Sequence, residues 1–337
     1  MNENAAIKLS FYGLGVEIKS SSAQTIEAVK KDFSFFKSKN TDAQVKIEIF
    51  LKAPDYKNLP SVTASVYTPR NICYRQGNIS YIDYFGKGLS IIDTSKSLYS
   101  IYSDDEYLSH EMAYLTIMSI VGQYLDSKSI HRVHGLGLDI NGKAVLILLP
   151  KGGGKTTLLL NLLKEKNVKL ISEDSPLIDK NSNILPFPIR IGVSCEEKPF
   201  FVDEKYLTFV KRMEFEPKYL IDIEAFKDKI SDKASKPWII LLGERSLGNE
   251  SKITPASKSK AFGEFVKNSV IGLGLYQGVE FILQKSPWEL LGKTGLLYSR
   301  FRNAAKVISK SKTYTFTLGC DISKNSATLL ELLKTRE

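Results

Sequence analysis

A glycine-rich segment followed by a lysine and two threonines is the part of this sequence best suited to bind phosphate. The segment PKGGGKTT (150–157) lies between an apolar run, AVLILL (144–149), and a leucine-rich continuation, LLLNLL (158–163). This pattern predicts a strand, a loop and a helix, and backbone N–H groups of such a loop and helix terminus point at an anion. We expect a nucleotide to be bound by Lys151, Gly152, Gly153, Gly154, Lys155, Thr156 and Thr157.

Two side chains of this loop have clear chemical tasks. Lys155 offers a mobile positive charge to the β- and γ-phosphates of ATP, and Thr156 offers a hydroxyl to Mg²⁺. Leu149 stands where the common pattern GxxxxGK[ST] has its first glycine. The glycines that let the backbone approach phosphate are retained at 152–154, so we expect Leu149 to turn into the core at the strand end.

A pair of carboxylates follows the next predicted strand. NVKLISEDSPLID (167–179) has the pattern of a strand that ends in Glu173 and Asp174. We expect this strand to lie parallel and next to the one before the glycine-rich loop, because both loops then meet at one edge of the sheet. A carboxylate at that edge can hold Mg²⁺ or accept the proton of an attacking hydroxyl, as phosphoryl transfer requires.

The remaining sequence predicts the elements that position these groups. Apolar periodicity and turn residues favour a small α/β module first, then a helix, then alternating strands and helices. The expected elements are a strand near 6–18, a helix from about 22, a hairpin at 74–84, a helix at 105–125, a hairpin around Asn141-Gly142, buried strands at 236–248 and 313–322, and mostly helix at 262–310.

The sequence resembles the HPr kinase/phosphorylases and their serine-kinase-like relatives, which share a P-loop core with ATP-type phosphoenolpyruvate carboxykinases. The resemblance covers about residues 130–195 well and the rest loosely. The residues that carry it are His134-Gly135, Asp139, Gly142, the loop 150–156 and Ser172-Glu173-Asp174.

This resemblance implies an α/β (α+β) fold with a P-loop core at 105–337 and a smaller acceptor-selecting or regulatory α/β module at 1–104. It implies that Asp174 is the general base and a ligand of Mg²⁺ with Thr156, and that Glu173 is its acidic neighbour. His134 is then a phosphate contact or an orienting partner of the catalytic carboxylate, and with Lys155 these residues are the expected catalytic group.

One segment departs from the family. Where the family has a second metal carboxylate, PFPIRIGV (186–193) has Pro188, whereas Arg190 is retained. The departure argues against a second protein ligand for Mg²⁺ and against a reverse phosphorylase reaction. We expect Arg190 to help neutralise the transferred phosphate. Arg245, at the end of another predicted strand, could also reach the site, but a strand-end arginine more often pairs with a local carboxylate.

These features favour an ATP- and Mg²⁺-dependent kinase that phosphorylates a hydroxyl, most simply that of serine, free or on a peptide or carrier protein. The alternative is a regulatory or scaffold protein that binds nucleotide with reduced turnover, for which Leu149 and Pro188 are the arguments. A carboxykinase-like enzyme is a weaker third candidate, because 337 residues are few for that family.

Composition narrows the partners. The net charge of +10 comes from lysines spread along the whole chain, without an arginine-rich arm, so we expect a solvated surface and no nucleic acid. The three cysteines lack CxxC spacing, which suits a reducing compartment, and the apolar runs are too short to span a bilayer. We therefore expect a cytoplasmic protein without a membrane span, and assembly into a homo-oligomer is compatible with the sequence.

Overall fold

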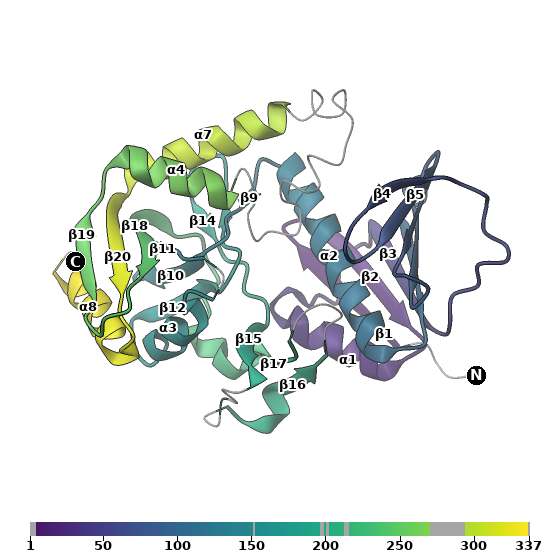
Figure 1. The fold of residues 1–337 in the computed structure, drawn as a ribbon, viewed down its shortest axis with the longest axis horizontal. Coiled ribbons are helices and arrows are strands. Elements are labelled where there is room, and N and C mark those ends of the chain that lie inside the picture. Colours follow the sequence, from purple (N-terminus) through teal and green to yellow (C-terminus); the bar gives the residue numbers. More distant parts are fainter. Residues whose placement is uncertain are drawn as a thin grey trace. The chain divides into compact units, whose positions relative to one another are not determined.

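The computed structural model describes residues 5–150, 152–195, 199, 202–211, 216–269 and 294–335. They form a mixed α/β fold with several sheets, which confirms the general fold class (Figure 1). Two compact units divide the chain: unit 1 comprises Met1–Val121 and Ile189–Ala225, and unit 2 comprises Gly122–Pro188 and Phe226–Glu337. Short 3₁₀ helices are η1 (Ser34–Phe36), η3 (Glu204–Tyr206) and η4 (Ile223–Lys229).

These units do not coincide with the division at 104/105 expected from the sequence. Residues 105–121 and 189–225 belong with the amino-terminal residues. Side-chain hydrogen bonds that join distant parts of the chain account for the difference: the Ser34 hydroxyl donates to Asp222 over 2.7 Å, and Lys31 Nζ donates to the backbone oxygen of Lys205 over 3.2 Å. Contacts of this kind have no local sequence signal.

An eight-stranded sheet forms most of unit 1. Its order is β1 (Ala5–Phe11), β2 (Leu14–Ser20), β3 (Val45–Leu51), β8 (Leu98–Ser103), β7 (Leu89–Asp93), β6 (Ile79–Asp83), β5 (Ile72–Gln76) and β4 (Ala64–Tyr67). β2, β3 and β8 are parallel, and the other pairs are antiparallel. The strand expected near 6–18 is two strands, because Tyr12 and Gly13 form a turn with positive φ. The hairpin expected at 74–84 is confirmed as β5 and β6.

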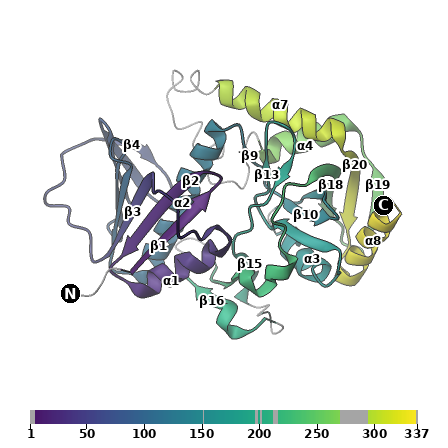
Figure 2. The same ribbon diagram turned by 180° about the vertical axis from the view of Figure 1, so that it is seen from behind.

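Two helices pack on this sheet. α1 (Ala23–Asp32) is capped by Ser22, whose hydroxyl accepts from the N–H of Thr25, and it packs against β1 and β2 (Figure 2). α2 (Glu106–Ser127) approaches the sheet so closely that a Cβ at Gly88 would lie 2.6 Å from the sulfur of Met112. No helix within the described part of the chain combines the length and apolar character needed to cross a membrane.

A buried charge cluster joins α1, α2 and a small antiparallel sheet of β15 (Ile191–Ser194), β17 (Lys218–Ile221) and β16 (Leu207–Val210). Asp32 Oδ2 lies 2.5 Å from Arg190 Nη1 and 2.7 Å from His110 Nε2. The Arg190 guanidinium also lies 3.7 Å from the ring centre of Tyr114. Burial alone would raise the pKa of Asp32, but the Arg190 charge and the His110 contact outweigh it and lower that pKa.

A six-stranded sheet with helices on both faces forms the centre of unit 2 (Figure 1). Its order is β12 (Val168–Ser172), β10 (Leu136–Ile140), β11 (Lys143–Leu148), β18 (Lys236–Arg245), β20 (Lys312–Leu318) and β19 (Lys252–Pro255). The helices are α3 (Lys155–Leu162) and α8 (Ile322–Lys334), which contact each other, and α4 (Lys258–Ser269) and α7 (Thr294–Lys310), which also pair. A smaller sheet contains β14 (Ile184–Leu185), β13 (Leu177–Ile178) and β9 (His131–Arg132).

The strand arrangement around the glycine-rich loop differs from the expectation in one respect. β11 and β12 do point in the same direction, but they are not neighbours: β10 lies between them and is antiparallel to both. The hairpin of β10 and β11 turns at Asn141 and Gly142, both with positive φ, as predicted. Both strands still end at the same sheet edge, so the loops after them meet there.

The Asp32 cluster predicts a large, pH-dependent contribution to the stability of the fold. Asp32→Asn leaves Arg190 buried without its counter-charge, which should lower the free energy of unfolding by about 3–5 kcal/mol. Because folding lowers the pKa of Asp32, this stabilisation is present above the ordinary pKa of 3.8 and is lost as the pH falls through the lower folded-state value.

Urea unfolding of the wild type and Asp32→Asn across a pH series measures this difference. It should be large at neutral pH and should narrow in acid. Glu27→Gln is the matched control, because Glu27 pairs with Lys30 on the exposed side of α1 and should contribute only about 0–1 kcal/mol. Equal effects of the two substitutions at neutral pH would contradict the role given to Asp32.

Candidate functional site

The glycine-rich loop has a backbone that requires its glycines. Gly152 and Gly154 have φ of 76° and 91°, a region that side chains with a Cβ rarely adopt. At Gly153 a Cβ would lie 2.9 Å from the backbone oxygen of Pro150, which itself accepts the N–H of Gly153. The chain then enters α3 directly at Lys155. The loop therefore presents bare backbone at a helix N-terminus, the arrangement that suits an anion.

Leu149 is buried, as the sequence predicted, with 1% of its surface exposed. Its side chain packs over Gly243 of the neighbouring parallel strand β18, where a Cβ would lie 2.3 Å from Leu149 Cδ2. The leucine at the usual glycine position thus fills space that Gly243 leaves open. It faces the core and also packs beneath the loop, where a Cβ at Gly153 would lie 3.2 Å from Leu149 Cδ2.

Lys155 lies at the centre of the candidate site. Its Nζ donates to the backbone oxygens of Leu149 and Pro150, at 2.8 and 3.3 Å, and lies 3.2 Å from His134 Nε2. Burial lowers the pKa of Lys155, and the negative charges of Asp174 and Glu173 offset only part of that effect. A partly buried cation held at the loop's base is well placed to meet phosphate oxygens.

The two carboxylates reach the loop from the end of β12. The Thr156 hydroxyl donates to Glu173 Oε1 over 2.5 Å, so the predicted Mg²⁺-binding hydroxyl already contacts a carboxylate. Asp174 Oδ1 lies 3.1 Å from His134 Nδ1, at an angle unsuited to a hydrogen bond. The Asp174 side chain is 39% exposed, whereas that of His134 is 8% exposed. Of His134 and Asp174, Asp174 is therefore the one that an incoming hydroxyl could approach, whereas Glu173 is bonded to Thr156.

The structure thus brings together five residues predicted from the sequence: His134, Lys155, Thr156, Glu173 and Asp174. Their oxygen donors suit Mg²⁺, which usually takes one or two carboxylates and completes its shell with water and phosphate oxygens. Across the described ranges no group of three or more His, Cys, Asp or Glu side chains could hold a metal alone. Mg²⁺ would therefore be held jointly by Thr156, a carboxylate and the nucleotide.

The structure does not show the other predicted residues joining this group. Lys151 is outside the described residues. Thr157 is half-buried within α3, where its backbone oxygen accepts from Asn161. Arg190 belongs to unit 1 and is bound there by Asp32, so we do not retain it as a phosphate contact.

Two residues that carried the family resemblance serve the β10–β11 hairpin. Asp139 accepts from the N–H of Gly142 over 3.1 Å and from the hydroxyl of Ser235. Gly142 has a φ of 81° and completes the turn. Their contacts are therefore structural.

Arg245 lies closer to the loop than its sequence context suggested. Its Nη1 lies 3.8 Å from the position a Cβ would take on Gly154, and it donates to the backbone oxygen of Gly319 over 3.2 Å. The signal that could have found it is topological. β18 is parallel to β11 and adjacent to it, so a residue at the end of β18 is delivered beside the loop.

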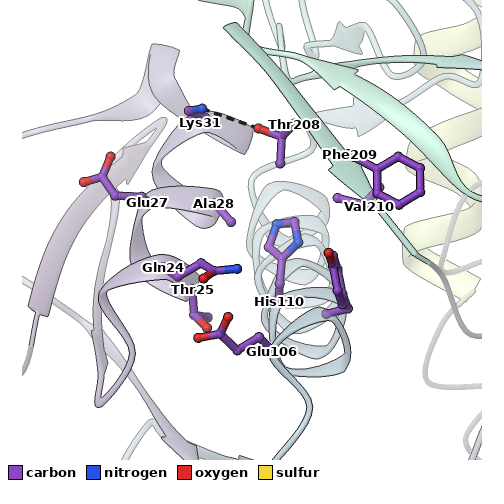
Figure 3. A pocket seen from close by; sticks show the side chains of 11 residues that line it. Gln24, Thr25, Glu27, Ala28, Lys31, Glu106, His110, Thr208, Phe209 and Val210 are labelled. Atoms are coloured by element: carbon purple, nitrogen blue, oxygen red, sulfur yellow. Dashed lines mark hydrogen bonds between the residues drawn. The ribbon is translucent and has the colours of Figure 1, made fainter. Parts of the chain in front are cut away.

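Unit 1 has a cleft of its own, of about 200 Å³, between α1, α2 and β16 (Figure 3). Figure 3 shows His110 in its centre, with Lys31 and Thr208 at one end and Glu106 at the other. Lys31 Nζ lies 3.5 Å from the Thr208 hydroxyl. The cleft thus combines a cation, a carboxylate and hydroxyl groups within one small volume.

Neither protein-family models nor curated proteins match the sequence. A functional assignment therefore depends on the residues and the geometry. What the residues and the geometry define is a mixed α/β unit with a strand, a glycine-rich loop and a helix at one sheet edge. A lysine, a histidine and two carboxylates converge on that loop.

The contact between Leu149 and Gly243 can be tested by a double-mutant cycle. Leu149→Ala should lower the free energy of unfolding by ~2–5 kcal/mol, as in other large-to-small core changes. Gly243→Ala should lower it by about 1–3 kcal/mol, because its Cβ overlaps Leu149. Gly243→Ala should lower the free energy of unfolding by less when residue 149 is already alanine. Chemical denaturation of the four proteins gives the coupling, and strictly additive losses would show that the two residues do not share this space.

Proposed function

We propose that the protein is a P-loop phosphotransferase of the HPr kinase-like type that transfers the γ-phosphate of ATP to a hydroxyl, with serine as the acceptor side chain or free amino acid. The observation that carries the proposal is the convergence of Lys155, His134, Asp174 and the Thr156–Glu173 pair on one glycine-rich loop. Phosphoryl transfer needs charge neutralisation and a positioned nucleophile, and this group offers both.

The loop and its cations bind the nucleotide in this proposal. Backbone N–H groups of Gly152, Gly154 and the first turn of α3 contact phosphate oxygens, and Lys155 supplies positive charge. Arg245 is added to this group because it lies beside Gly154. Mg²⁺, held with the nucleotide by Thr156 and a carboxylate, would neutralise negative charge on the phosphates.

Asp174 accepts the proton of the acceptor hydroxyl. It is the more exposed member of the His134–Asp174 pair. His134 lies 3.1 Å from Asp174 and 3.2 Å from Lys155, and we assign it the task of orienting the carboxylate. Glu173 is committed to Thr156, so the two neighbouring carboxylates have separate tasks: Glu173 supports the metal-binding hydroxyl, and Asp174 activates the nucleophile.

We assign acceptor recognition to unit 1, with its cleft as the candidate contact. A serine-containing peptide or protein would find hydrogen-bonding groups in Thr208 and charges in Lys31 and Glu106. In this proposal the protein acts in the cytoplasm, with ATP and Mg²⁺ as cofactors.

A regulatory nucleotide-binding protein with reduced turnover is the second candidate function. The observation in its favour is that Arg190, a basic residue of the family segment, is bound to Asp32 within unit 1, and that Pro188 leaves this segment without a metal carboxylate. Incubation with labelled ATP, Mg²⁺ and acceptors including free serine separates the two functions. Tight ATP binding without transfer to any acceptor would favour the regulatory protein.

Nucleotide binding should depend on Lys155. Lys155→Ala removes a charge-assisted contact, which is worth about 1.5–3 kcal/mol, so the affinity for ATP should fall at least about tenfold. Calorimetry measures the affinity. Lys164→Ala is the control, because Lys164 is an exposed lysine just after α3 that contacts only Asn161 among the bonds described, and it should leave affinity unchanged. An unchanged affinity in folded Lys155→Ala would refute the P-loop assignment.

Catalysis should depend on Asp174 more than on Glu173. General base catalysis contributes about 10²–10⁴-fold, so Asp174→Asn should lower the rate of phosphoryl transfer by that factor while affinity for metal-free ATP changes little. Glu173→Gln should instead raise the Mg²⁺ concentration needed for half-maximal rate, and excess Mg²⁺ should restore the rate. Transfer by Asp174→Asn at the wild-type rate would remove Asp174 from the mechanism.

A further inference from the structure

A second group of chemically competent side chains lies outside the glycine-rich loop. Asp126 at the end of α2, His131 in β9 and Ser299 in α7 form one continuous chain of hydrogen bonds within unit 2. Asp126 Oδ1 lies 2.8 Å from His131 Nδ1, and His131 Nε2 lies 2.8 Å from Ser299 Oγ. The order carboxylate, imidazole, hydroxyl is that of a base-activated serine.

The two nitrogens of His131 have different roles in this chain. A carboxylate only accepts hydrogen bonds, so Asp126 fixes the hydrogen of the neutral ring on Nδ1. Nε2 then carries a lone pair and accepts the hydroxyl hydrogen of Ser299. This is the tautomer that a general base requires, and the carboxylate also stabilises the imidazolium that forms when the base takes a proton.

The surrounding contacts hold Asp126, His131 and Ser299 in place. His131 is 2% exposed and the Asp126 side chain 12% exposed. Burial alone would raise the pKa of Asp126, but the His131 hydrogen bond and the Arg300 charge outweigh it, so that pKa is lowered and Asp126 stays ionised. One turn after Ser299, Asn303 donates to the backbone oxygen of Ser129, which fixes α7 against the segment between Asp126 and His131.

The solvent exposure of the three hydrogen-bonded side chains differs as a nucleophile requires. Asp126 and His131 are covered, whereas Ser299 is only half-buried. A purely structural hydrogen bond would satisfy His131 equally well, but it would give Ser299 no reactivity above that of Ser309, the other serine of α7. The reactivity of Ser299 is therefore the property that separates the two roles.

We propose that Ser299 is a nucleophile that accepts an acyl group from small activated esters. Ser299 Oγ forms a bond to the carbonyl carbon while its proton passes to His131 Nε2. The bond from that carbon to the leaving oxygen then breaks, and the leaving group departs with the proton from His131. Water then attacks the carbonyl carbon of the acyl-serine while one of its protons passes to His131 Nε2. The bond from that carbon to Ser299 Oγ breaks, Ser299 takes the proton back from His131, and the carboxylic acid is released.

The position of Ser299 limits the substrate class. It lies inside α7, where backbone N–H groups bond to the preceding turn, so the helix offers no free pair of N–H groups around Ser299 to stabilise an oxyanion. Esters with a good leaving group need that stabilisation least. We therefore expect acylation by aryl esters and slow turnover, and no cleavage of peptides.

The test uses the full-length protein and 4-nitrophenyl acetate, with release of 4-nitrophenol followed by absorbance and the acetylated residue located by mass spectrometry. The wild type should show acetylation at Ser299. Ser299→Ala should abolish that adduct, and His131→Gln should slow acetylation of Ser299 at least ~10²-fold. Ser309→Ala is the matched control: Ser309 lies on the same helix but donates to a backbone oxygen, and its loss should change nothing.

Several outcomes would overturn the proposal. One is a wild-type adduct found only on lysines or on serines other than Ser299. Another is equal acetylation of Ser299 and Ser309, which would mean that the hydrogen bond to His131 confers no reactivity. If His131→Gln does not fold, Asp126→Asn replaces it, and undiminished acetylation in that variant has the same meaning. Ser299 should be acetylated in Lys155→Ala as it is in the wild type. A failure of this proposal is therefore distinguishable from a failure of the kinase proposal.

Discussion

The need to satisfy one partly buried positive charge organises the candidate nucleotide site. The ammonium group of Lys155 finds its partners at the end of β11, in the backbone oxygens of Leu149 and Pro150, and beside them in His134. The carboxylates that follow β12 add negative charge nearby. A cation that leaves water must be compensated from several directions, and here the ends of β11 and β12 supply those partners. The sheet edge and the site are therefore parts of one arrangement.

The parts that the sequence predicted well depend on short-range rules. The Asn141-Gly142 turn requires positive φ at both residues, and these residue types permit it. The helix expected from about 22 begins at Ala23, where the Ser22 hydroxyl accepts an N–H of the first turn. The strand, loop and helix around Lys155 follow from an apolar run, three glycines and a leucine-rich run. Each signal lies within a few residues of the structure that it specifies.

The parts that the sequence did not predict depend on which distant segments meet. β10 lies between β11 and β12, and nothing in three adjacent apolar segments fixes that order. Arg190 follows β12 closely in sequence, yet its charge is balanced by Asp32, far away along the chain. Arg245 is the opposite case. It is remote in sequence from the loop, but because β18 pairs with β11 it lies beside Gly154. In both cases tertiary topology decided the partner of the arginine.

The three histidines show how far a third partner and solvent access determine the role of one chemical pair. Each contacts an aspartate, in the pairs His110–Asp32, His131–Asp126 and His134–Asp174, whose aspartate side chains are 3%, 12% and 39% exposed. In the first pair Arg190 approaches the same ring nitrogen as Asp32, and the three side chains form a buried charge cluster. In the second a serine hydroxyl occupies the other ring nitrogen, and that hydroxyl is half-buried. In the third a lysine occupies it and the carboxylate itself meets solvent, so proton acceptance falls to the aspartate. An imidazole beside a carboxylate therefore specifies no function alone; the third group at the ring and the member of the pair that solvent reaches specify it together.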